Sequence, residues 1–90
     1  MKLNHINLVV SNVAGAIKLF ETYFSFKCTD IKGDNIVAIL KGADDFTLVV
    51  MPDKNGQATY PDAFHIGFML DSTDAVTEIY EKLKSAGVDV

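Results

Sequence analysis

The chain opens on alternating apolar and polar positions over residues 3–10, the pattern of a β-strand with one buried face. Ser11 or Asn12 then supplies a side chain that can cap a helix. Apolar residues follow at spacings of four, three and four, which place them on one side of an amphipathic helix: Val13, Ile17, Phe20 and Phe24. We therefore predict a strand followed by a helix that stops near Ser25.

Three further apolar segments predict three strands, Phe26–Ile31, Asn35–Lys41 and Phe46–Met51. The Gly/Asp clusters at 32–34 and 42–45 separate them and suit hairpin turns. Residues 1–51 are thus expected to form one β-α-β-β-β module. The polar tract 52–62 contains two prolines and an Asn-Gly pair, so it is expected to be a linker loop.

A second strand-and-helix pattern fills residues 63–90. Residues 63–70 are predicted to form a strand, and Asp71 or Ser72 caps the next helix. Its apolar stripe is made of four residues: Ala75, Val76, Ile79 and Leu83. Gly87 ends that helix, and residues 88–90 begin another extended segment. We expect here the start of a second, incomplete module, because its remaining strands lie outside the sequence.

The two patterns are related by a repeat. His5–Ser11 aligns with His65–Asp71 at a constant offset of 60, and the chain has two histidines. Side chains alternate between the two faces of a strand, so each histidine is expected to point away from its helix. Any two strand-helix units look alike, but the recurrence of histidine at one position favours a duplicated module.

Composition excludes several classes of function. The net charge is −4, and the eight basic residues are scattered lysines, so neither a nucleic-acid surface nor a basic membrane face is expected. Apolar runs of five residues or fewer are too short to span a bilayer. Cys28 is the single cysteine, which excludes an internal disulfide and suits a reducing, cytoplasmic setting. We expect Cys28 to be inert.

The run from Leu3 to Ser11, followed by Ala16–Glu21, resembles the opening of a vicinal oxygen chelate module. This superfamily includes glyoxalase I, bleomycin- and fosfomycin-resistance proteins and extradiol dioxygenases. Ala63–Phe68 is similar to the opening strand of its second module. The resemblance implies an α+β fold, a cup-shaped sheet and a divalent metal ion (Zn, Ni, Mn or Fe). It further implies that His5 and His65 are metal ligands.

The sequence departs from the family pattern at the carboxylate ligands. Val49 lies near the place of the glyoxalase glutamate, and Asp44 and Asp45 come too early, in a turn. The glutamate of the second module would lie beyond residue 90. Asn7 and Thr47 would share the face of His5 and are candidate substrate-binding residues, and Tyr60 in the linker could cover a pocket. No catalytic base is identified.

Three interpretations follow. The first is a metal-dependent lyase, isomerase or dioxygenase that acts on a small molecule with vicinal oxygens. The second is a bleomycin-resistance-type protein that binds small molecules without metal or chemistry. The third is a ferredoxin-like domain whose role is pairing with another chain. Because the second module would have unpaired strand edges, a homodimer is expected.

Overall fold

The structure is a computed structural model that describes residues 1–33, 36–56 and 58–88. It divides into two compact units, Met1–Thr59 and Tyr60–Val90, each described here by itself. The division falls within the predicted linker 52–62. Asp34 and Asn35, which were assigned to a turn and a strand start, lie outside the described residues, as do Asp89 and Val90.

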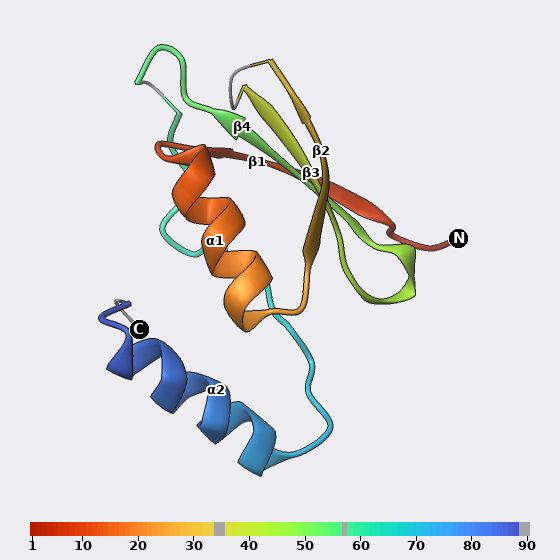
Figure 1. Cartoon of the computed structure of the whole chain (residues 1–90), viewed down its shortest axis with the longest axis vertical. Helices are drawn as coiled ribbons and strands as arrows, with labels where there is room; N and C mark the ends of the chain where they lie inside the picture. The colour runs from red at the N-terminus through yellow and green to blue at the C-terminus, as the bar shows by residue number, and fades with distance from the viewer. Residues whose placement is uncertain (34–35, 57, 89–90) are drawn as a thin grey trace. The chain divides into compact units, whose positions relative to one another are not determined.

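The first unit contains the predicted β-α-β-β-β order (Figure 1). Its elements are β1 (His5–Val10), α1 (Val13–Tyr23), β2 (Lys27–Lys32), β3 (Val37–Lys41), the 3-10 turn η1 (Ala43–Asp45) and β4 (Thr47–Pro52). The strands form one sheet in the order β1-β4-β3-β2. The fold class predicted from the sequence, α+β with a β-α-β-β-β module, is confirmed.

The last strand of the unit lies beside the first. The next three strands, β2, β3 and β4, are consecutive antiparallel neighbours. The chain crosses from β1 to β2 through α1, which leaves a place next to β1 that β4 occupies in parallel. Residues more than forty positions apart in sequence thereby become neighbours, for example His5 and Thr47.

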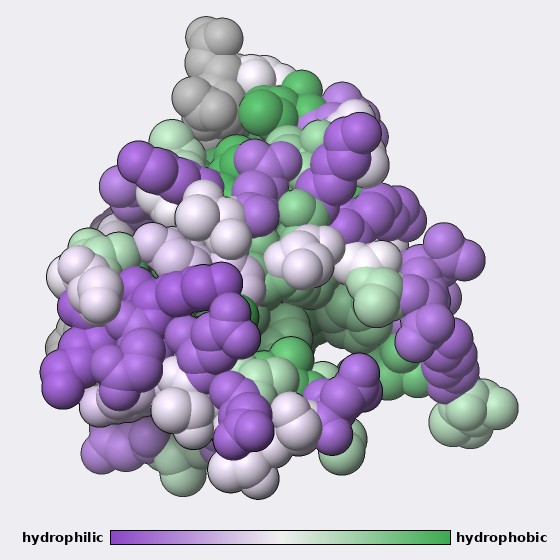
Figure 2. Space-filling view, turned by 60° about the horizontal axis from the view of Figure 1, so that its bottom comes forward, coloured by the Kyte–Doolittle hydropathy of each residue, from purple (hydrophilic) through white to green (hydrophobic). Residues whose placement is uncertain are grey.

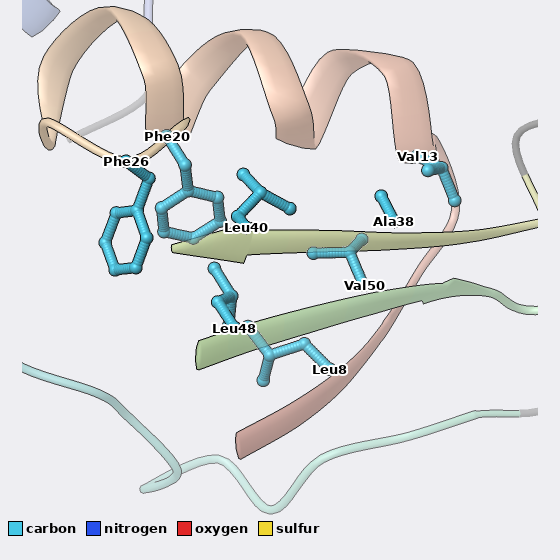
Figure 3. Packing of buried hydrophobic residues seen from close by; sticks show 8 residues of the cluster. All are labelled: Leu8, Val13, Phe20, Phe26, Ala38, Leu40, Leu48 and Val50. Carbon is cyan, nitrogen blue, oxygen red and sulfur yellow. The ribbon is translucent and has the colours of Figure 1, made fainter. Parts of the chain in front are cut away.

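The core of this unit lies between α1 and one face of the sheet (Figure 3). Val13 and Phe20 of the predicted helix stripe are buried, and Ile17 and Phe24 pack against them in part. The sheet contributes alternate residues from its three adjacent strands: Leu8, Ala38, Leu40, Leu48 and Val50. The helix stripe and the strand alternation therefore meet in a single apolar layer.

Both helix starts use one of the residues that the sequence proposed as caps. The Asn12 Oδ1 accepts a hydrogen bond from the backbone N–H of Gly15 at 2.9 Å. In the second unit, the Ser72 Oγ accepts one from the Ala75 N–H at 3.1 Å, and α2 runs over Thr73–Ser85. Each bond satisfies one of the donors that a helix leaves unpaired in its first turn.

Gly87 ends α2 as predicted. Its φ is +82°, the left-handed conformation that glycine adopts without a steric penalty. The Gly87 N–H donates to the Lys84 carbonyl at 3.1 Å, and the Val88 N–H donates to the Leu83 carbonyl at 3.0 Å. This pair of bonds is the Schellman arrangement, and it stops the helix while satisfying its last carbonyls.

The strand predicted over residues 63–70 is not present as a strand. The segment is neither helical nor part of any ladder among the described residues. A strand needs a neighbour to satisfy its backbone groups, and no described strand pairs with this segment. The helix α2 that follows is present, but none of its side chains is buried.

Large apolar side chains are consequently exposed in the second unit. Phe64, Ile66, Phe68 and Leu70 are each about two-fifths exposed, and Met69 is almost fully exposed. Figure 2 shows one face of the molecule, where apolar surface lies among hydrophilic side chains.

Neither α1 nor α2, over the residues described, is long and apolar enough to cross a membrane.

Candidate functional site

The candidate site is the face of the sheet opposite α1, called here the open face. The β1–β4 register pairs His5 with Thr47 and Asn7 with Val49. These residues alternate with Leu8 and the other core residues, so they lie on the side that the helix does not cover. As expected from the sequence, this alternation places the side chain of His5 on the face away from the helix.

His5 is the first residue of β1 and its side chain is exposed. Its Nδ1 lies 2.8 Å from the Asn4 Oδ1. An amide oxygen only accepts hydrogen bonds, so this contact needs the proton on Nδ1, which in a neutral ring leaves the lone pair on Nε2. A neutral imidazole oriented through its other nitrogen is the form that binds metal ions.

His65 shows the same arrangement in the second unit. Its Nδ1 lies 3.0 Å from the carbonyl oxygen of Ala63, which again only accepts. In a neutral His65 ring this contact likewise leaves the lone pair on Nε2. The two histidines related by the sequence repeat thus present the same ring nitrogen, each in its own unit.

The predicted substrate-binding residues have specific partners. The Asn7 Nδ2 donates to the Met51 Sδ at 3.1 Å, across the β1–β4 pair. The Thr47 Oγ1 accepts from the Lys41 Nζ at 2.6 Å. Tyr60 belongs to the second unit, where its ring stacks on Phe64 with centroids 4.8 Å apart. Asn7 and Thr47 are brought together with His5; Tyr60 is described only within its own unit.

Lys41 was not selected from the sequence. It occupies the last position of β3, directly opposite Thr47 in the antiparallel register. Strand alternation places it on the open face, since Leu40 beside it is buried. Side-chain alternation along the strand could have placed Lys41 on this face from the sequence. Its contact with Thr47 could not be predicted, because it depends on which strand pairs with β3.

The described residues do not complete a metal site. No group of three or more His, Cys, Asp or Glu residues able to hold an ion occurs among them. On the open face, β4 presents Thr47, Val49 and Met51, none of which is a carboxylate. Asp44 and Asp45 lie in η1, as expected for turn residues. Each unit presents one imidazole, a common metal ligand, and no group of described residues completes an ion site around either one.

Cys28 has a structural environment. Its backbone N–H donates to the Glu21 Oε2 at 2.8 Å, which joins β2 to α1. Its thiol lies 3.6 Å from the Asp30 carbonyl, beside a β-bulge in the β2–β3 pairing. These contacts describe the packing of Cys28, and its inertness stays a prediction.

Comparison with known proteins gives a consistent result. The model of the Glyoxalase/Bleomycin resistance protein/Dioxygenase superfamily matches residues 2–90. A solved structure described as a possible glyoxalase from Bacillus cereus is 36% identical, with a TM-score of 0.88. The match covers 97% of this chain and 75% of that one.

A second solved structure is similar in fold alone. It is an integron cassette protein from the mobile metagenome of the Halifax Harbour sewage outfall, 14% identical, with a TM-score of 0.73. The match covers 96% of this chain and 71% of that one. No curated protein sequence matches the chain.

Proposed function

Since the chain belongs to the Glyoxalase/Bleomycin resistance protein/Dioxygenase superfamily, we propose that it acts in a metal-dependent enzyme for a small molecule with vicinal oxygens. The reaction would be of the lyase, isomerase or dioxygenase type. The observation that carries the proposal is the hydrogen-bonding geometry that the imidazole rings of His5 and His65 share. Both place Nδ1 within hydrogen-bonding distance of an oxygen acceptor, so Nε2 would be the nitrogen that binds an ion.

His5 and His65 would supply two imidazole ligands in this proposal. A bound divalent ion would act as a Lewis acid that polarises the oxygens of the substrate. The described residues do not complete its ligand set, so no reaction step is derived through it. The roles that this chain's residues can fill are binding and orientation. Asn4 and the Ala63 carbonyl orient the two rings, while Asn7 and Thr47 offer polar atoms to a substrate.

The second candidate is a binding protein that takes up small molecules without metal. The observation that favours it is the absence of a carboxylate on the open face of β4, where Val49 stands. In that case the open face would bind the ligand, and the histidines would have no ion to hold. Metal content separates the two candidates.

The test is elemental analysis of the purified full chain and of the variants His5→Ala and His65→Ala, after incubation with Zn, Ni, Mn or Fe(II) and desalting. We expect the unsubstituted protein to retain metal and each variant to lose it, because each substitution removes one of the two imidazole ligands. Asn55→Ala, in a turn of the linker, is the control and should retain metal. Equal metal content in all four proteins would contradict the role of the histidines.

If the unsubstituted chain retains no metal, the second candidate is favoured. It then predicts that a small-molecule ligand raises the melting temperature in the presence of a chelator. A ligand that stabilises the protein only after metal is added would instead support the enzyme.

A further inference from the structure

A row of hydrogen-bonding side chains crosses the open face from one edge of the sheet to the other. The registers pair His5 with Thr47, Thr47 with Lys41, and Lys41 with Lys27. We call these four residues the polar row. It holds two ammonium groups, an imidazole and a hydroxyl, and no carboxylate. Two lysines therefore share one row of the open face, and no acidic residue belongs to that row.

The hydrogen bond at the centre of this row orients a second donor. The Lys41 ammonium can only donate, so the Thr47 oxygen is the acceptor of the 2.6 Å bond. The hydroxyl hydrogen of Thr47 is then available to a ligand, together with the other two N–H groups of Lys41. An ammonium and a hydroxyl that both present hydrogens favour an anionic oxygen between them.

Among the described residues, neither lysine of the polar row forms an ion pair with a carboxylate. The ion pair found among the described residues joins Lys82 to Glu78 on α2, and neither Lys41 nor Lys27 takes part in one. Asp30 is the acid on the next row, opposite Ile39, and Asp44 and Asp45 lie in the adjoining turn η1. The charge of the row is therefore available to an external anion.

The next row along the open face is apolar at its centre. Val49 pairs with Ile39, and both side chains are half-buried. The two rows are two residues apart along β3 and β4, about 6.8 Å at the rise of a strand, so a small molecule held at Lys41 and Thr47 reaches this apolar pair without leaving the two strands. The face thus combines an anion-binding end with an apolar surface.

We propose that Lys41 and Thr47 bind the anionic group of a small organic acid, whose apolar part lies on Val49 and Ile39. This assignment names the substrate class and rests on the proposed function of the open face as a small-molecule site. The anionic group is a carboxylate or a phosphate, both of which accept hydrogen bonds from an ammonium and a hydroxyl.

The proposal is tested by NMR titration of the ¹⁵N-labelled full chain with benzoate, phenyl phosphate and the neutral benzamide, in EDTA. We expect saturable shifts of the Lys41 and Thr47 amides with an anion and not with benzamide. The tighter of the two anions identifies the class of the group. Shifts of equal size with benzamide, or no shifts on β3 and β4 with either anion, would overturn the proposal.

Substitutions then assign the contacts. Lys41→Gln removes the charge, and Thr47→Val removes the hydroxyl while keeping a β-branched side chain. Each should weaken anion binding by about three- to tenfold, as expected for one exposed hydrogen bond to a charged group. Lys18→Gln makes the same charge change on the exposed side of α1 and should bind like the unsubstituted protein. Affinities of the Lys41 and Thr47 variants equal to that of the Lys18 variant would refute the assignment.

The titration does not depend on metal, because EDTA is present throughout. Failure of anion binding with normal metal retention by the histidines would remove this proposal alone. Anion binding without metal retention would remove the metal-dependent function and keep the acid-binding site.

Discussion

Gly42 lies where the ring of Phe26 crosses the end of β3. A Cβ built on Gly42 would stand 2.6 Å from the Phe26 Cε1, closer than two carbon atoms pack. Phe26 is a buried core residue whose ring also meets Phe20 edge-on, with centroids 5.7 Å apart. The absence of a side chain at residue 42 therefore lets an aromatic ring close one end of the core.

From this contact we predict that Gly42→Ala destabilises the protein. The added methyl group must displace a buried ring, and such overpacking lowers the free energy of unfolding by about 1–3 kcal/mol. Urea unfolding followed by circular dichroism measures the change. Gly67→Ala is the matched control, because a Cβ at Gly67 meets nothing within 4 Å. Equal stability of the two variants would contradict the packing described for Phe26.

At the scale of elements, α1 depends on its first turn as well as on its apolar stripe. The helix has no acidic residue in its first turn and no basic residue in its last, so charges do not support its ends. The hydrogen bond from Gly15 to Asn12 is then the main local contribution at the N-terminus. α2 differs, with Asp74 in its first turn and Lys82 and Lys84 in its last.

We expect Asn12→Ala to lower the free energy of unfolding by about 1 kcal/mol, the usual loss when a capping side chain is removed. Ser11→Ala is the control, since the residue that caps α1 in the structure is its neighbour Asn12. Thermal unfolding by calorimetry compares the two. A larger loss in the Ser11 variant than in the Asn12 variant would mean that the helix is capped differently.

At the scale of the whole molecule, residues 63–70 carry exposed apolar side chains in a strand pattern and belong to no sheet of the described residues. A segment of this kind is satisfied when its backbone pairs with another strand. We therefore predict that the 90-residue chain self-associates, most simply as a two-fold dimer.

Light scattering coupled to size exclusion, together with intact mass, measures this directly. The expected particle has twice the chain mass of 9.8 kDa. Replacing Phe68 by Lys should weaken the association, whereas replacing Thr77 by Lys on α2 is the control for added charge. A single species of 9.8 kDa over the whole concentration range would refute the prediction.

The local elements of this protein could be predicted from its sequence. The strand alternation of the first unit, the stripe Val13–Phe24, the caps and the stop at Gly87 depend on neighbouring residues, and each of these was recovered within one or two positions. The family was also predicted, because its motifs are local runs around the two histidines. The phase of His5 followed from the same alternation, since side chains on a strand change face at every residue.

Contacts between distant segments were decided by the tertiary structure. Only the parallel insertion of β4 beside β1 places Thr47 opposite His5, and only the β3–β4 register adds Lys41 to that row. For residues 63–70 the local pattern predicted a strand, yet no ladder forms among the described residues. The physical reason is the same in both cases. The spacing of apolar residues determines which face of a segment is buried. Strand pairing instead depends on hydrogen bonds between two segments, and the pattern within one segment does not specify its partner.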